Sequence, residues 1–377
     1  MNILIAGDYC DKLRVKSQIA HGEYDAMFGN VKPIVELADF SIINFEFPIV
    51  RSTGAPIKKC GPNLKGQLAS VDAIRYAGFN VATLANNHIL DQGAECAVET
   101  QRALNDIGIK TVGLGGGRLQ NRETILYLEK QQVKVAVINC CEHEFSVTSS
   151  NTVGANPLNP VNIFYQIQEA RTQSDYVIVI SHGGHEHFNL PSPRMKELYR
   201  YLVDAGADAV INHHQHCYSG YEIYKGKPIF YGLGNFLFDH ATFRNKFWNE
   251  GYMVLLKLDE GTLSFDLVPY TQCNESASVQ PMDKVGHEKF NTEIQRLNYI
   301  IADDSKLHEH VDEYYEKCSR YELANLEPYQ GHICSKLLSM GLLPHWIKGQ
   351  KISNILNHVN CESHRDKLIY ALTKMNK

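Results

Sequence analysis

Six residues that follow apolar segments of the chain carry side chains typical of metal ligands. They are Asp8, Glu46, Asn87, His182, His214 and His216. Histidine is concentrated in the same part of the chain, since seven of the 17 histidines lie between His182 and His240. A set of carboxylate, amide and imidazole donors suits Mn, Fe or Zn better than Mg or Ca. Six donors are too many for one tetrahedral ion, and they suit two divalent ions about 3.5–4 Å apart.

The strength of this pattern lies in the combination. A single histidine after a strand is more often a structural residue with a hydrogen-bond partner than a metal ligand. Three imidazoles, two carboxylates and an amide, all placed just after apolar segments, form a much more specific pattern. The prediction therefore depends on whether the fold brings these positions together.

The positions meet only if the apolar segments before them are neighbouring strands, because ligands of α/β proteins bind beyond the carboxyl ends of the strands. Strands are predicted at residues 2–7, 40–45, 80–85, 133–140, 175–181, 208–213, 227–233 and 252–258. Helices are predicted between them at residues 65–77, 93–107, 159–173 and 193–205. This alternation predicts an α/β fold.

Several predicted strands are continuously apolar, as in the run VIVI at 177–180. Such runs indicate that both faces of a sheet are covered. The segment YEIYKGKPIFYG, residues 221–232, is instead typical of a hairpin. The two patterns together predict a mixed sheet or two packed sheets.

The chain changes character near residue 285, where helical spacing replaces the strand patterns. We therefore divide it into residues 1–280, which carry all six candidate ligands, and a helical C-terminal extension, residues 281–377. The extension is expected to pack against the first part and cover its surface, or to mediate a homodimer. It is expected to supply no metal ligand.

Composition and charge argue against several classes of protein. The chain has 377 residues, of which 44% are hydrophobic and 21% charged, with a net charge of -5. This is not the basic balance of proteins that bind nucleic acid or an anionic membrane surface. No apolar segment approaches the roughly 20 residues of a membrane span, and MNILIAGD lacks the features of a signal peptide. We expect a cytoplasmic protein without a membrane span, and its ten scattered cysteines are expected to stay reduced.

Six motifs, in order along the chain, resemble those of the CapA family, the capsule and poly-γ-glutamate synthesis proteins. The motifs are GD (7–8), NFEFP (44–48), ANNHILDQG (85–93), HGGHEH (182–187), NHHQH (212–216) and YGLGNFLFD (231–239). The combination of ANNHxxDxG with GNFxFD is specific. The resemblance covers roughly residues 1–240 and implies a calcineurin-like metallophosphoesterase fold, a two-sheet sandwich flanked by helices.

The resemblance also implies a role for each candidate ligand. The first ion would take Asp8 and His216, Glu46 would bridge the two ions, and the second ion would take Asn87, His182 and His214. His88 would face the substrate as a general acid or charge partner, and Asp91 would orient it through a hydrogen bond.

Two features depart from the family pattern. Cys10 occupies the position of a histidine ligand in the wider superfamily; it is either a thiolate ligand or a small buried residue. Gly183 and His187 stand where an aromatic pair is usual, which implies a wider or more polar pocket. Nearby, Glu186 either supports the metals or contacts substrate, or is only a surface acid, and Arg194 is a candidate for binding an anionic group of the substrate.

These features predict a binuclear metal-dependent hydrolase that acts on an anionic small molecule or polymer. Phosphoester hydrolysis is the first hypothesis, and amide (γ-glutamyl) hydrolysis or transfer is the second. A non-catalytic, metal-stabilised accessory protein of polymer synthesis is the rival class. The capsule or surface-polymer context rests on the resemblance alone.

Overall fold

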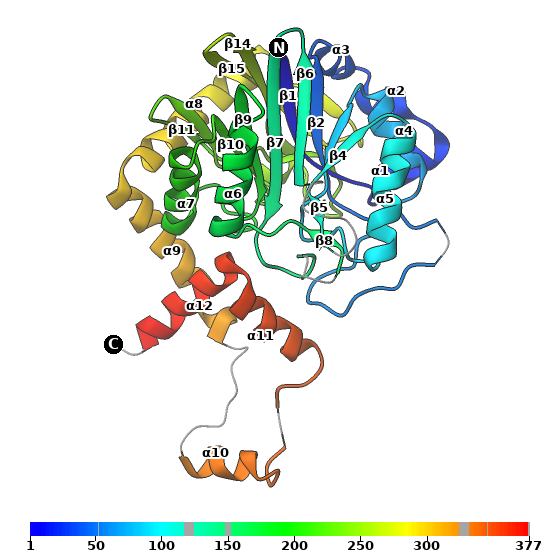
Figure 1. Ribbon diagram of the computed structural model, residues 1–377. Coiled ribbons are helices and arrows are strands. Elements are labelled where there is room, and N and C mark those ends of the chain that lie inside the picture. Colours follow the sequence, from blue (N-terminus) through cyan, green and yellow to red (C-terminus); the bar gives the residue numbers. More distant parts are fainter. Residues whose placement is uncertain (52, 117–123, 148–151, 324–331, 345, 376–377) are drawn as a thin grey trace.

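The computed structural model describes residues 1–51, 53–116, 124–147, 152–323, 332–344 and 346–375. Two mixed β-sheets lie at the centre, helices cover them, and C-terminal helices lie against one end of the sandwich (Figure 1). The predicted α/β two-sheet sandwich with a helical C-terminal extension is confirmed. None of the described helices combines the length and the apolar composition needed to span a membrane.

The first sheet contains the N-terminal strand of the chain. Its strands are β1 (Asn2–Cys10), β2 (Phe40–Phe45), β3 (Val81–Thr83), β4 (Lys110–Val112), β13 (Asn235–Phe238), β14 (Glu250–Asp259), β15 (Thr262–Gln272) and β16 (Val279–Pro281). Their order is β16-β15-β14-β1-β2-β3-β4, and β13 also pairs with β1. The pairs among β1, β2, β3, β4 and β13 are parallel, whereas β14, β15 and β16 pair antiparallel. The parallel strands therefore deliver several carboxyl ends to one edge.

The second sheet has a similar plan. Its strands are β6 (Ile125–Lys130), β7 (Val133–Cys141), β9 (Tyr176–His182), β10 (Ala209–His213), β11 (Tyr221–Tyr224) and β12 (Lys227–Phe230), in the order β11-β12-β10-β9-β7-β6. The central pairs are parallel, and the two edge pairs are antiparallel. The predicted hairpin is β11–β12. Two short strands, β5 (Leu114–Gly115) and β8 (Gly154–Ala155), pair separately.

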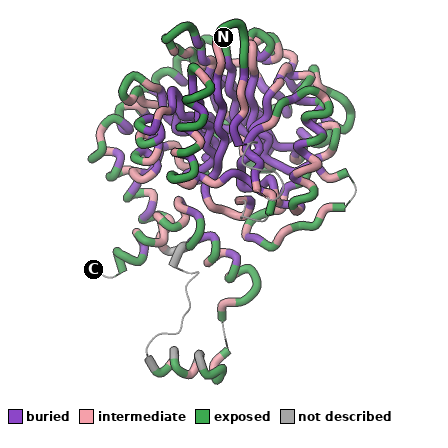
Figure 2. The backbone as a smooth tube through the Cα atoms, viewed as in Figure 1, coloured by how far each residue is buried: buried purple, intermediate pink, exposed green. Residues whose placement is uncertain are grey.

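The central strands are buried on both faces (Figure 2). In β1, Ile3 and Ile5 belong to an apolar cluster shared with the second sheet, whereas Leu4 and Ala6 belong to a cluster shared with the helices of the other face. Successive strand residues point to opposite faces, so a continuously apolar strand holds a sheet between two layers. This packing fixes the strand ends that carry the polar residues.

Helices follow most of the parallel strands. Those of the first sheet are α1 (Arg14–His21), α2 (Tyr24–Phe28), α3 (Lys32–Val35), α4 (Ala69–Tyr76) and α5 (Ala94–Asp106); those of the second are α6 (Pro160–Arg171) and α7 (Pro193–Asp204). Asn159 and Ser192 cap α6 and α7, and each cap is followed by a proline at the first helical position. The chain therefore enters both helices in a fixed direction.

The C-terminal helices are α8 (Lys284–Ala302), α9 (Asp304–Leu323), α10 (His332–Ser339), α11 (Gln350–Asn360) and α12 (Glu362–Met375). Buried residues of α8, including Phe290 and Leu297, join the apolar cluster of the second sheet. Helix α9 contacts α7 and α8, and α12 packs on α9. The extension thus returns to the sandwich through α11 and α12 (Figure 1).

The four predicted helices and the eight predicted strands all form, with shifts of a few residues at their ends. Relative to its predicted length, the segment that shortens most is 80–85, of which only Val81–Thr83 is a strand. Helices α1–α3 and strands β4, β5, β6, β8, β13, β15 and β16 were not predicted. Short elements such as β13, with four residues, give too little periodicity to detect in a single sequence.

Candidate metal and catalytic site

The six candidate ligands lie at or just beyond the carboxyl ends of strands from both sheets. Three belong to the first sheet, at β1, β2 and β3, and three to the second, at β9 and β10. They are Asp8, Glu46, Asn87, His182, His214 and His216, and all six are buried. The fold therefore brings the predicted positions to one place between the sheets.

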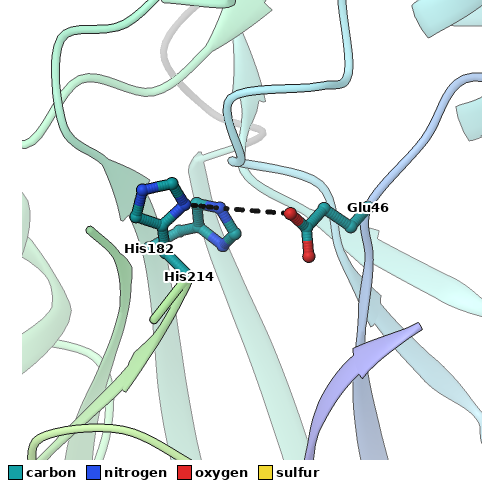
Figure 3. Close-up of side chains that lie close together, drawn as sticks. All are labelled: Glu46, His182 and His214. Atoms are coloured by element: carbon teal, nitrogen blue, oxygen red, sulfur yellow. Dashed lines mark hydrogen bonds and ion pairs between the residues drawn. The ribbon is translucent and has the colours of Figure 1, made fainter. Parts of the chain in front are cut away.

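The potential donor atoms form two groups that share Glu46. One group consists of Asp8, Glu46 and His216, and the other of Glu46, His182 and His214; within each, the donor atoms lie within 4.8 Å of one another. Figure 3 shows Glu46 directed from the first sheet toward the two imidazoles of the second. One carboxylate thus lies between two sets of donors, as a residue that bridges two ions must.

The Glu46 carboxylate is buried, and neither oxygen has a hydrogen-bond partner among the described residues. Its Oε1 lies 3.8 Å from His182 Nε2 and 3.7 Å from His216 Nε2, too far for hydrogen bonds. Burial raises the pKa of Glu46 well above its usual range, and the Asp8 carboxylate raises it further. A buried carboxylate without donors costs several kcal/mol. Cations at this point would remove that cost, so the residues fit a metal site.

The second group has the spacing of ligands that share an ion. His182 Nε2 lies 3.1 Å from both Asn87 Oδ1 and His214 Nδ1. Ligand atoms about 2.1 Å from one ion lie about 3.0–3.4 Å apart in octahedral or tetrahedral geometry. In the first group, the Glu46 and Asp8 carboxylates outweigh the effect of burial and raise the pKa of His216 to about 10.

Two asparagines orient the ligand side chains. Asn44 donates a hydrogen bond to Asp8 Oδ1 at 2.7 Å and lies 3.2 Å from His182 Nδ1. Asn235 Oδ1 lies 2.9 Å from His216 Nδ1, which leaves Nε2 of that ring directed at Glu46. Such outer partners fix the orientation of ligating imidazoles. Asn235 belongs to the GNFxFD motif, so one residue of this motif serves to orient a candidate ligand.

The turn after β10 is strained. His214 and His216 have φ angles of 92° and 55°, in the left-handed region that favours glycine. Holding a residue there costs of order 1–3 kcal/mol, and such strain is concentrated at functional sites. The strained turn directs both imidazoles toward Glu46. No sequence motif indicates this strain.

Cys10 is a buried core residue. It packs in the apolar cluster between the first sheet and its helices, and burial raises the pKa of its thiol well above the usual range, with a further contribution from Glu46. Among the described residues, the groups of potential donor atoms do not include Cys10. Of the two interpretations of this residue, the small buried side chain agrees with the structure.

His88 and Asp91 form the hydrogen bond that the family resemblance implied. Asp91 Oδ2 lies 2.6 Å from His88 Nδ1, and the two residues lie in one turn, closed by a hydrogen bond from the Asp91 amide to the His88 carbonyl. With Nδ1 facing Asp91, the other ring nitrogen, Nε2, is left for a ligand. Burial lowers the pKa of His88, and the nearby Lys59 lowers it further.

The sequence pattern does not distinguish Lys59 from its neighbour Lys58, but the structure does. Its side chain is buried, and Nζ lies 2.5 Å from Asp91 Oδ1 and 3.1 Å from His88 Nδ1. Asp91 also accepts a hydrogen bond from the backbone amide of Leu64. Residues far apart in sequence therefore hold the Asp91 carboxylate against His88.

A cavity of about 390 Å³ lies beside these residues. The sandwich contributes Lys59, Asn87, His88, Glu144, Glu186 and His214 to its lining, and the C-terminal helices contribute further residues. The volume falls within the ~300–1,000 Å³ range of small-molecule sites. Two of the candidate ligands, Asn87 and His214, and also His88 thus border a space large enough for a substrate.

Glu186 and Arg194 differ in position. Glu186 lines the cavity, and its carboxylate lies near His214 and His216. Arg194 is not among the lining residues, because its guanidinium is held by Glu142 and Asp366 at 2.7 and 2.8 Å. The ion pair with Asp366 ties α12 to the sandwich, and the role of Arg194 in substrate binding stays a prediction.

The chain belongs to the family of bacterial capsule synthesis proteins, PGA_cap, whose family model matches residues 2–240. It is 32% identical over 278 residues to the capsule biosynthesis protein CapA of Bacillus anthracis, covering 71% of this chain and 67% of that protein. It is 31% identical over 248 residues to the PGA biosynthesis protein CapA of Bacillus subtilis, covering 65% and 64%. The segment that the family model matches, residues 2–240, contains all six candidate ligands and the His88–Asp91 pair. Helices α11 and α12 lie outside this segment.

Solved structures with a similar arrangement include a phosphatase from Mycoplasma pneumoniae, 15% identical, with a TM-score of 0.47 over 73% of this chain and 95% of that one. A 5'-nucleotidase from Candida albicans is 12% identical, with a TM-score of 0.43 over 84% and 57%.

Proposed function

We propose that the protein is a hydrolase that uses two divalent ions, Mn, Fe or Zn, to cleave a phosphoester in an anionic small molecule or polymer. The observation that carries this proposal is the Glu46 carboxylate, buried without hydrogen-bond donors and shared by two groups of donor atoms. The adjoining cavity, lined by His88, supports catalysis over a purely structural metal site. The catalytic unit would be residues 1–280.

The candidate ligands divide between the two ions. Asp8 and His216 would hold one ion, Asn87, His182 and His214 the other, and Glu46 both. Two bound ions would lower the pKa of a shared water to give hydroxide near neutral pH, and would neutralise an anionic oxygen of the substrate. The protein would contribute the positions of the donors, which the two sheets hold rigidly.

His88 would transfer a proton at the leaving group. Its Nδ1 faces Asp91 at 2.6 Å, so Nε2 would be the atom that donates to the leaving oxygen. Asp91 would keep the ring in this orientation, and Lys59 would keep Asp91 in place. A metal-stabilised accessory protein would have no use for a buried His88–Asp91 pair at a cavity.

Amide hydrolysis or transfer is the second candidate. It is favoured by the names of the Bacillus relatives, which connect the family to capsule and PGA biosynthesis. The same residues could act on a γ-glutamyl amide, with His88 donating its proton to the leaving nitrogen. A cytoplasmic location and a homodimer formed through the extension stay predictions.

Metal analysis followed by a substrate panel tests the proposal. Full-length protein should carry up to two transition-metal ions per chain. It should then hydrolyse p-nitrophenyl phosphate or bis(p-nitrophenyl) phosphate faster than γ-glutamyl-p-nitroanilide. A preference for the anilide would select the amide reaction. Metal-loaded protein without activity on any of the three would support the accessory role, and protein without bound metal would overturn the binuclear site.

A further inference from the structure

The C-terminal helices α11 and α12 form part of the wall of the catalytic cavity. They contribute six lining residues, which are Asn354, Asn357, His358, Ser363, His364 and Lys367. These residues lie outside the segment that matches the family model. The capsule-synthesis segment therefore supplies the candidate ligands, and a separate segment supplies a second wall.

Polar contacts hold this wall in place. His364 Nε2 lies 3.2 Å from Glu144 Oε1, and Ser363 donates a hydrogen bond of 2.7 Å to Glu142. At the other end of the wall, the Gln350 side chain donates to the backbone carbonyl of Lys59, the residue that supports Asp91. The wall is thus attached to the residues around the site, and its position over the cavity is defined.

The wall differs in charge from the sandwich side of the cavity. The sandwich contributes the carboxylates of Glu144 and Glu186 and the buried Lys59–Asp91 pair. None of the six residues from α11 and α12 is acidic, and one of them, Lys367, is a lysine. An anionic group of a ligand would therefore be stabilised on this side of the cavity.

Asn357 gives an independent sign of a ligand. Its side chain lines the cavity and is only 5% exposed, yet its Oδ1 has no hydrogen-bond partner among the described residues. A buried amide oxygen without a donor costs about 1–3 kcal/mol. A ligand with an N–H or O–H group beside its anionic group would supply the missing donor.

We propose that α11 and α12 form a second subsite, in which Lys367 binds a carboxylate or phosphate of the substrate and Asn357 binds an adjacent N–H or O–H group. The proposal rests on the hydrolase function, and it defines the substrate class as molecules with two anionic groups. One group reacts beside Glu46, and the other, distant from the reacting atom, is held by Lys367. The cavity is large enough for more than a single phosphoryl group.

Binding of stable phosphonates to the full-length, metal-loaded protein tests the subsite. Calorimetry would compare methylphosphonate, which has one anionic group, with phosphonocarboxylates of increasing chain length and with the matching bisphosphonates. At least one two-anion compound should bind about tenfold more tightly than methylphosphonate, the effect of one charge-assisted contact. The carboxylate and phosphonate series show which second group is preferred. If no two-anion compound gains affinity, the proposal is wrong.

Two variants identify the residues. Lys367→Met should abolish the tenfold preference and leave the affinity for methylphosphonate unchanged. Lys374→Met is the matched control, because Lys374 lies on the same helix and does not line the cavity. A preference that survives Lys367→Met would overturn the assignment of the second anion to this wall.

Asn357→Leu separates a ligand contact from a structural role. If the amide serves the ligand, this variant should raise the Tm of the ligand-free protein, because it removes a buried polar atom without a partner, and should weaken binding of two-anion compounds that carry an N–H or O–H group. A lower Tm with unchanged binding would show that Asn357 is structural. Failure of the hydrolase proposal looks different: the binding preference would persist without turnover of any substrate.

Discussion

The two walls of the cavity are positioned by different means. On the sandwich side, Asn87, His88 and His214 follow the buried strands β3 and β10. On the other side, α12 is attached by ion pairs such as Arg194–Asp366 and His143–Glu362, whose side chains are partly exposed. Reaction chemistry requires donor atoms in rigid positions. Because α11 and α12 are held by a few polar contacts, substitutions in these helices can alter the binding wall without displacing the donor atoms.

The largest effect is expected for Glu46→Gln, which tests the donor atoms that the sandwich holds in place. Because Glu46 is shared by both donor groups, the variant should lose at least one ion, and turnover should fall at least about 10³-fold, or about 4 kcal/mol of barrier. Without metal, however, Glu46→Gln should be more stable than the unchanged protein, because a buried carboxylate without donors has been removed. Metal analysis and thermal unfolding measure both effects.

Glu260→Gln is the control for this experiment, since Glu260 is an exposed acid at the β14–β15 turn. Asn87→Ala and His214→Ala should each lose at least one ion as well. Full metal content in Glu46→Gln would contradict the bridging role.

The second prediction separates catalysis from metal binding. His88→Ala should lower turnover of phenyl phosphate about 10²–10⁴-fold, or about 3–5 kcal/mol of barrier, with metal content unchanged. The loss should be smaller for p-nitrophenyl phosphate, whose leaving group needs little protonation. Steady-state kinetics on the two esters measure the difference. His308→Ala, on the exposed face of α9, is the control.

Loss of metal from His88→Ala would make His88 a ligand and would contradict the assignment of Asn87. Unchanged turnover of phenyl phosphate would rule out the proton transfer.

The two walls also differ in how much of them the sequence predicts. The candidate ligands follow apolar strands, so a local pattern marks each one, and the parallel topology brings them together. No local sequence pattern identifies Lys59 as a buried residue, because its burial depends on Asp91, which is 32 residues away in the chain. Lys367 and Asn357 are less predictable still, since their helical pattern says nothing about which surface α11 and α12 cover. Arg194 shows the same limit, because its partner Asp366 is in the extension.

The third prediction concerns Lys59. Lys59→Met should lower the free energy of unfolding by about 3–5 kcal/mol, because the Asp91 carboxylate would stay buried without its cationic partner. Lys58→Met, at the neighbouring exposed lysine, should have little effect. Denaturant unfolding measures both. The double variant Lys59→Met, Asp91→Asn should recover part of the loss; equal stability of the two Lys→Met variants would contradict a structural role for Lys59.

The fourth prediction concerns a variant that weakens the attachment of α12 and leaves the candidate metal ligands unchanged. Arg194→Leu removes the ion pair with Asp366 that joins α12 to the sandwich and the ion pair with Glu142 within the sandwich, and should cost about 1.5–3 kcal/mol. Hydrogen exchange should rise in α12 and not in β9 or β10, and metal content should stay the same. KM for two-anion substrates should rise more than kcat falls. Arg365→Leu, at an exposed arginine of α12, is the control. Metal loss in Arg194→Leu would show that the two walls are not independent.

The smallest predicted effect is a pH dependence of the same attachment. A hydrogen bond of 2.7 Å from His143 Nδ1 to the Glu362 carboxylate raises the pKa of His143, and burial only partly opposes this shift. Since the folded pKa lies above the unfolded value of about 6.5, the contribution of His143 is complete below that pH and is lost as the pH rises through the raised value. Burial raises the pKa of Glu362, but the contacts with His143 outweigh this effect, so its pKa is lowered. The contribution of Glu362 to stability is therefore lost only as the pH falls through that lowered value.

Hydrogen exchange in α12 should therefore be slowest in mildly acidic solution and increase toward alkaline pH, after correction for the intrinsic pH dependence of exchange. His143→Gln should remove this increase. If α12 is equally protected across this range in the unchanged protein, the His143–Glu362 pair does not hold the wall, and other contacts such as Arg194–Asp366 and His364–Glu144 would account for its attachment.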